Sequence, residues 1–247
     1  KRTTRTMRTT RTAIVFTAAA AACAAGLSAP ALAQISGDTV KIGMITDLSG
    51  VYSDIDGNGG AEAVRMAIAD MGGAINGKKI QFIVADHQNK PDIAASKARE
   101  WFDQQGVDML IGGTNSGASL AMAKVAAEKK KVFIAIGSGT AQLTNEQCSP
   151  YTVHYAYDTV ALARGTGATM VKQGGKTWYF LTADYAFGQS LEKDTTDVIK
   201  ANGGTVLGSV KPCDPATMPA HSAATAVTML ACVNESILGD TARASST

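Results

Sequence analysis

Residues 107–119 read VDMLIGGTNSGAS, and residues 132–140 read VFIAIGSGT. Each stretch joins a short apolar run to a loop rich in Gly and Ser. The first stretch continues into a helical pattern from Ser116 to about Lys129. A buried strand, a tight loop and a helix in succession form the repeating unit of a parallel sheet covered on both faces. These stretches therefore predict an α/β fold.

The same alternation extends towards the N-terminus. Short apolar runs predict strands at 40–45 and 80–85, before those at 107–111 and 132–136. Apolar residues at helical spacing predict helices over 61–71 and 91–102. The predicted buried faces comprise Ala61, Val64, Ala67, Ile68 and Met71 in the first helix and Ala94, Ala98, Trp101 and Phe102 in the second. Asp47–Gly60 is predicted to be a Gly-, Ser- and Asp-rich loop, and Asn76-Gly77 a turn. Residues 40–136 therefore have the order β-α-β-α-β-α-β.

A second run of the same kind follows an irregular β-prone segment at 151–157. Helices are predicted at 160–171 and 191–199, and strands at 177–182 and 205–210. We therefore predict an N-terminal lobe over 38–155 and the start of a second α/β lobe over 156–211. Residues 212–247 are rich in Ala, Ser and Thr, which fits either a disordered tail or a terminus that does not belong to the fold. Within them, residues 226–233 could form a short element.

The first 33 residues have the pattern of a secretory signal peptide. Residues 1–11 are basic without an acidic residue, residues 13–27 are apolar, and Ala31-Leu32-Ala33 is a small-x-small cleavage pattern. A lipid anchor at Cys23 is the alternative. Cleavage before Gln34 predicts a periplasmic protein with no stable membrane insertion.

Composition excludes several classes of function. Without residues 1–33 the chain carries 18 basic and 21 acidic residues, so no basic excess points to nucleic acid. Cys148, Cys213 and Cys232 would remain, an odd number with no CxxC or Cys/His pattern for a metal. The sequence has no nucleophile elbow, P-loop or dinucleotide-binding pattern, and its histidines lack motif partners. We expect no catalytic residues, metal or cofactor.

Ligands of parallel α/β sheets bind at the carboxyl ends of the strands. The loop with Asn115 and Ser116 offers backbone N–H groups, a hydroxyl at the N-cap and the positive end of a helix dipole. The loop Gly137-Ser138-Gly139-Thr140 offers similar donors after the next strand. Ordinary turn chemistry accounts for either loop alone. Two adjacent loops of this kind are a candidate seat for a carboxylate.

Aromatic residues follow strands at the same predicted edge. Tyr52 lies in the first loop, and Tyr185 and Phe187 follow the strand predicted at 177–182. Aromatic rings on such loops can sandwich an apolar or ring-bearing ligand, although packing at the sheet edge is an equal explanation for each.

The runs VKIGMITDLSG (40–50), GNGGAEAVRMAIADMGGAINGKKIQFIVADHQNKPDIAASKA (57–98), IGGTNSGAS (111–119) and TADYAFGQS (182–190) resemble type I periplasmic solute-binding proteins of ABC transporters. The likeness extends over about residues 40–210 and is greater to the branched-chain amino acid binding subgroup, which includes leucine-binding proteins. It implies the periplasmic-binding-protein type I fold, with two α/β lobes, crossovers between them and a ligand in the cleft.

The resemblance also implies roles for single residues. Ser116 would donate to a carboxylate, Gly137 would offer its carbonyl, and Ser138 to Thr140 would supply backbone and hydroxyl groups. Tyr52 would line the ligand's side-chain end, and Phe187 the wall of the second lobe. Gly137-Ser138-Gly139 departs from amino acid binders, and the loop at 52–54 resembles members that take aromatic or other carboxylic acids.

The expected partners are a small amino acid or carboxylic acid and an ABC permease in the inner membrane. A ligand sensor of the same fold is the alternative. The likeness stops near residue 211, whereas the family's mature chains are longer. We therefore expect a truncated chain with an incomplete second lobe and an unrelated tail, which could be a non-functional fragment.

Overall fold

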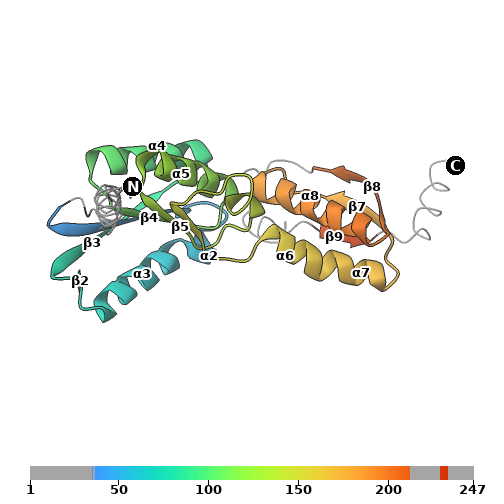
Figure 1. The fold of residues 1–247 in the computed structure, drawn as a ribbon, viewed down its shortest axis with the longest axis horizontal. Helices are drawn as coiled ribbons and strands as arrows, with labels where there is room; N and C mark the ends of the chain where they lie inside the picture. Colours follow the sequence, from blue (N-terminus) through green and yellow to red (C-terminus); the bar gives the residue numbers. More distant parts are fainter. Residues whose placement is uncertain (1–34, 36, 212–228, 233–247) are drawn as a thin grey trace, which may run out of the picture. The chain divides into compact units, whose positions relative to one another are not determined.

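The computed structural model describes residues 35, 37–211 and the backbone of 229–232 (Figure 1). The predicted signal peptide and nearly all of the predicted tail lie outside these residues. Within the described ranges, no helix has the length and apolar character needed to cross a bilayer.

The first lobe is built on a six-stranded sheet in the order β2-β3-β1-β4-β5-β6. Its central strands pair in parallel, and only the edge strand β2 is antiparallel to β3. The strands are β1 (Thr39–Thr46), β2 (Ala74–Ile75), β3 (Lys78–Asp86), β4 (Met109–Gly112), β5 (Val132–Ala135) and β6 (Thr152–His154). The carboxyl ends of β1, β4 and β5 therefore lie side by side.

Helices cover both faces of this sheet (Figure 1). α4 (Pro91–Gln104) and α5 (Ser116–Lys129) pack on one face, and α3 (Asn58–Asp70) on the other. Gly43 is required under α4, because a Cβ there would lie 2.6 Å from ring carbons of Trp101. Both faces of β1 are thus buried, as expected for a central parallel strand.

A second sheet has the order β8-β7-β9. β7 (Thr177–Leu181) pairs in parallel with β8 (Thr205–Val210) and antiparallel with β9 (Met229–Cys232). Trp178, Phe180, Val171 and Ile199 form its core. The helices are α6 (Thr159–Ala163), the π-helical turn η2 (Arg164–Ala168), α7 (Thr169–Lys172) and α8 (Ala186–Ala201).

The predicted α/β order is confirmed, and α5 and β8 have the predicted bounds. The predicted loop at 47–60 was wrong in part, because it contains the short helix α2 (Ser53–Asp56) and the start of α3. The predicted continuous helix at 160–171 is interrupted by η2, where Gly165 and Gly167 weaken α-helical structure. Met71 was predicted on a buried helix face but is 61% exposed, since α3 contacts the sheet through Ala61 and Val64.

Candidate functional site

The first loop of the candidate site follows β4 and leads into α5. Asn115 is the N-cap, and its Oδ1 accepts a hydrogen bond from the backbone N–H of Ala118 at 2.7 Å. Its amide nitrogen donates to Oδ1 of Asn89, which fixes the capping side chain from a neighbouring loop. The predicted hydroxyl at the N-cap is therefore wrong, because an amide caps the helix. This leaves the hydroxyl of Ser116 free of any capping role.

Ser116 and Ser138 share an unusual environment. Both side chains are fully buried, and neither Oγ has a hydrogen-bond partner among the described residues. A buried polar group without a partner costs about 1–3 kcal/mol. Such groups are uncommon in native proteins, so each calls for a physical explanation. Because Ser116 follows β4 and Ser138 follows β5, the two hydroxyls belong to adjacent loops.

The backbone around Ser138 is held from two sides. His154 Nε2 lies 2.6 Å from the carbonyl oxygen of Ser138, so the ring N–H donates to it. Gly137 lies directly above Thr114, because a Cβ at Gly137 would be 2.9 Å from Thr114 Oγ1. The second loop is thus packed against the first, with no room for a larger residue at 137.

Gly139 forms the floor beneath an aromatic ring of the second lobe. A Cβ at this position would lie 2.7 Å from Cε2 of Phe187 and 3.0 Å from Cε2 of Tyr157. Phe187 is in the first turn of α8, so the start of that helix lies over the loop after β5. Gly139 and Phe187, which were each predicted to line the site, are therefore neighbours.

Tyr52 and Tyr185 meet through their hydroxyls. Tyr52 OH donates to Tyr185 OH, and the ring centroids are 6.4 Å apart. The ring of Tyr185 also lies 6.1 Å from that of Phe187. Burial raises the pKa of both phenols, so both are neutral and can donate hydrogen bonds. The three aromatic residues predicted for the site thus form one cluster.

Thr140 is already engaged. Its Oγ1 lies 2.8 Å from Oγ of Ser190 on α8, and it caps the short helix η1 (Ala141–Leu143) by accepting from Gln142 N. Ser190 Oγ also accepts a hydrogen bond from the side-chain amide of Gln142, at 3.1 Å. In this arrangement Thr140 joins the two lobes, and its hydroxyl is occupied by Ser190.

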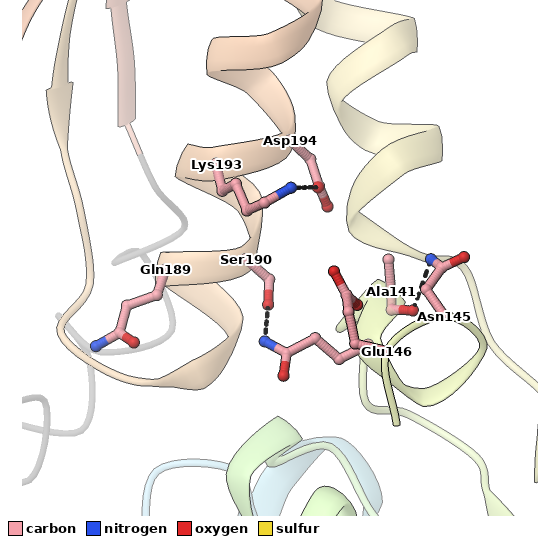
Figure 2. A pocket seen from close by; sticks show the side chains of 8 residues that line it. Ala141, Asn145, Glu146, Gln189, Ser190, Lys193 and Asp194 are labelled. Atoms are coloured by element: carbon pink, nitrogen blue, oxygen red, sulfur yellow. Dashed lines mark hydrogen bonds and ion pairs between the residues drawn. The ribbon is translucent and has the colours of Figure 1, made fainter. Parts of the chain in front are cut away.

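A small polar cavity of about 200 Å³ lies beside this contact (Figure 2). Ligand pockets usually measure about 300–1,000 Å³ and are mostly apolar. Here the wall includes Glu146, Lys193 and Asp194, of which Lys193 and Asp194 pair with each other. The cavity therefore has neither the size nor the apolar character of a typical ligand pocket.

Acidic groups and one histidine lie behind the loops. Asp47, Asp56 and His87 are all buried. Burial raises the pKa of Asp56 and lowers that of His87, since each would lose hydration in its charged form. Among the described residues, no three His, Cys, Asp or Glu side chains are placed to hold a metal ion.

Sequence patterns did not single out Tyr157, Asp56 or Ser190. Of these three residues, Tyr157 is the easiest to find from the sequence, because it ends the irregular β-prone segment at 151–157 that leads into the second lobe. Asp56 lies in the predicted loop at 47–60 and Ser190 just before the helix predicted at 191–199, and only the fold brings both residues to the site. The site brings together two buried hydroxyls, the N-terminus of α5 and an aromatic wall made by Tyr52, Tyr185 and Phe187. Hydroxyls and a helix N-terminus can donate hydrogen bonds to an anion, and aromatic rings can contact an apolar group.

Comparison with known proteins gives a consistent result. A family model described as periplasmic binding protein matches residues 39–226. A periplasmic binding protein from Burkholderia mallei is 70% identical, with a TM-score of 0.69, over 71% of this chain and 47% of that one. No curated protein matches the chain.

Two further solved structures resemble the chain. A branched-chain amino acid ABC transporter periplasmic ligand-binding protein from Burkholderia xenovorans is 34% identical, with a TM-score of 0.60, over 70% of this chain and 46% of that one. An ABC transporter solute-binding protein from Rhodopseudomonas palustris, in complex with 3,4-dihydroxybenzoic acid, is 28% identical, with a TM-score of 0.64, over 73% and 49%. The chain spans about half the length of the solved structures it matches.

Proposed function

The chain belongs to the periplasmic binding protein family, and we propose that it provides the anchoring part of a carboxylate-binding site that serves an ABC importer. The family consists of extracytoplasmic solute-binding proteins of transport systems, which bind solutes and are not enzymes. The proposed partner is an ABC permease in the inner membrane. The proposed location is the periplasm, reached through the N-terminal signal peptide.

The observation that carries the proposal is the pair of buried serine hydroxyls at 116 and 138. Each can donate one hydrogen bond, and a carboxylate has two oxygens that accept. The N-terminus of α5 adds backbone N–H groups and the positive end of the helix dipole beside Ser116. A carboxylate bound there gains charge-assisted hydrogen bonds, which are stronger than those to a neutral group.

The aromatic cluster supports a ring on the other end of the ligand. The ring centroid of Tyr185 lies 6.4 Å from that of Tyr52 and 6.1 Å from that of Phe187, separations typical of interacting aromatic rings. Because Gly139 has no side chain, the Phe187 ring has room over the loop. The relative from Rhodopseudomonas palustris binds a dihydroxybenzoic acid. We therefore favour an aromatic acid over an aliphatic amino acid.

The test is calorimetric titration of the chain with benzoate, 3,4-dihydroxybenzoate, benzamide and L-leucine. The aromatic acids are expected to bind, and benzamide, which lacks the charge, to bind at least about tenfold more weakly. Ser116→Ala and Ser138→Ala should each weaken benzoate binding by about 1–3 kcal/mol, the cost of losing a hydrogen bond to a charged group.

Thr195→Val is the matched control. Thr195 is fully buried on α8, and its Oγ1 also has no partner among the described residues. Its replacement should leave binding unchanged. Equal affinity for benzoate and benzamide, or unchanged affinity in both serine variants, would overturn the proposal.

A further inference from the structure

Asp56 connects parts of the first lobe that are distant in sequence. It ends α2, and its Oδ1 accepts a hydrogen bond from Thr46 Oγ1 at 3.1 Å. Its Oδ2 accepts from Thr114 Oγ1 at 2.8 Å. Thr46 is the last residue of β1, and Thr114 lies two residues before Ser116. One carboxylate therefore holds the end of β1 and the loop that begins α5.

Two glycines give this carboxylate its space. A Cβ at Gly137 would lie 3.3 Å from Asp56 Oδ2, and a Cβ at Gly113 would overlap both Asp56 Oδ2 and Thr46 Oγ1. Asp56 thus fills the volume directly behind the loop with Ser116 and the loop with Ser138. The same short helix carries Tyr52 at its N-cap, so the aromatic wall is tied to this point as well.

Burial of the Asp56 carboxylate is energetically unfavourable. Asp56 is 8% exposed, and its side-chain hydrogen-bond donors in the described chain are neutral hydroxyls rather than Lys or Arg. Burial raises the pKa of this carboxyl more than those hydrogen bonds lower it. A buried charge without a cationic partner is destabilising, and such groups are retained mainly at functional sites.

We propose that Asp56 is a positioning residue for ligand binding, which holds the Gly113–Ser116 and Gly137–Ser138 loops against each other. The inference rests on the proposed function. Asp56 acts through its two threonine contacts and through the backbone of the two glycines, not by contact with the ligand. Removing its side chain frees the hydroxyls of Thr46 and Thr114 and opens a space behind both loops.

Asp56→Asn and Asp56→Ala separate positioning from general stability. A threonine hydroxyl can donate or accept. The amide can therefore accept from one threonine and donate to the other, in nearly the same volume, whereas alanine can do neither. Asp56→Asn should keep the loops in place, and Asp56→Ala should release them.

The first readout is hydrogen exchange of the ligand-free chain, followed by mass spectrometry of peptides over 111–119 and 134–141. In Asp56→Ala, both segments should exchange about tenfold faster or more, while residues 177–181 of β7 are unchanged, because local opening is confined to the released loops. Asp56→Asn and the control Thr195→Val should stay within about threefold of the parent chain.

The second readout is titration with 3,4-dihydroxybenzoate. Asp56→Ala should lose about tenfold or more in affinity, and Asp56→Asn should restore it to within about threefold. Unchanged exchange in either loop, or faster exchange spread evenly over the chain, overturns the positioning role. If the parent chain does not bind this acid, the proposed ligand class fails, and the exchange comparison still decides the role of Asp56.

Discussion

The phenol hydroxyl of Tyr52, at the start of α2, donates a hydrogen bond to the phenol hydroxyl of Tyr185, at the start of α8. The two residues are 133 positions apart in the sequence. Tyr52 lies in a loop of the six-stranded sheet, and Tyr185 lies in a loop of the second sheet. Both side chains are half-buried, and burial raises the pKa of both phenols, so both hydroxyls stay protonated. The pair is therefore placed to exchange its hydrogen bond for one to a polar group on a bound ring.

Tyr52→Phe should remove the discrimination between hydroxylated and plain benzoates. We expect the affinity for 3,4-dihydroxybenzoate to fall by about 1 kcal/mol while that for benzoate changes little, since only the hydroxylated ring can bond to the phenol. Paired titrations of the variant with both acids measure this difference. An equal loss for both acids would show that the tyrosine contributes packing rather than recognition.

Gly139→Ala should disturb the site through Phe187. The added Cβ would lie 2.7 Å from the Phe187 ring, and overpacking of this kind costs about 1–3 kcal/mol. Both the melting temperature and the affinity for benzoate should fall, and Phe187→Leu in the same chain should recover part of the loss. Gly59→Ala in α3 is the control, because no atom lies within 4 Å of its added Cβ. A Gly139→Ala chain as stable as the parent would contradict the contact.

His87 should make stability depend on pH. Its Nδ1 accepts a hydrogen bond from the backbone N–H of Asn89 at 3.0 Å, and the ring is fully buried. The folded protein therefore favours the neutral imidazole. Burial lowers its folded-state pKa below the ordinary 6.5. The unfolded chain then binds more protons, and the free energy of unfolding should fall as the pH drops below about 6.5 towards the folded-state pKa.

Urea denaturation between pH 5.5 and 7.5 measures this effect. His87→Gln removes the titrating group and should flatten the profile in that window. If the parent and the variant lose stability in parallel as the pH falls, His87 is not the group responsible.

Asn115→Ala should weaken the start of α5. The loss of the side-chain cap on the Ala118 N–H costs about 0.5–2 kcal/mol. Asn115→Asp keeps an acceptor at the cap and should retain most of the stability, although it loses the amide that donates to Asn89. Thermal unfolding of the two variants checks this order, and equal melting temperatures would contradict the capping role.

Sequence patterns predicted much of the fold, because buried parallel strands read as short apolar runs and amphipathic helices as periodic ones. Ala94, Ala98, Trp101 and Phe102 were all placed correctly on the buried face of α4. The helix α2 was missed, since four residues rich in Asp carry no periodicity. β9 was expected only as a short element, because its pairing with β7 is set by tertiary contacts.

The candidate site was predictable only at the level of its loops. Gly, Ser and aromatic residues after strands identify Ser116, Ser138 and Phe187, because the carboxyl ends of parallel strands converge. The contact of Thr140 with Ser190, and the place of Asp56 behind two glycines, depend on how separate elements pack. Neither contact can be predicted from the spacing of residues in the sequence.

The most direct test of the central claim is a crystal structure of the chain with 3,4-dihydroxybenzoate. We predict that the carboxylate oxygens lie within about 3 Å of Ser116 Oγ and Ser138 Oγ, with the ring against Phe187 and the ring hydroxyls towards Tyr52 and Tyr185. A carboxylate bound away from both serines, or a ligand bound in the reverse orientation, would contradict the account.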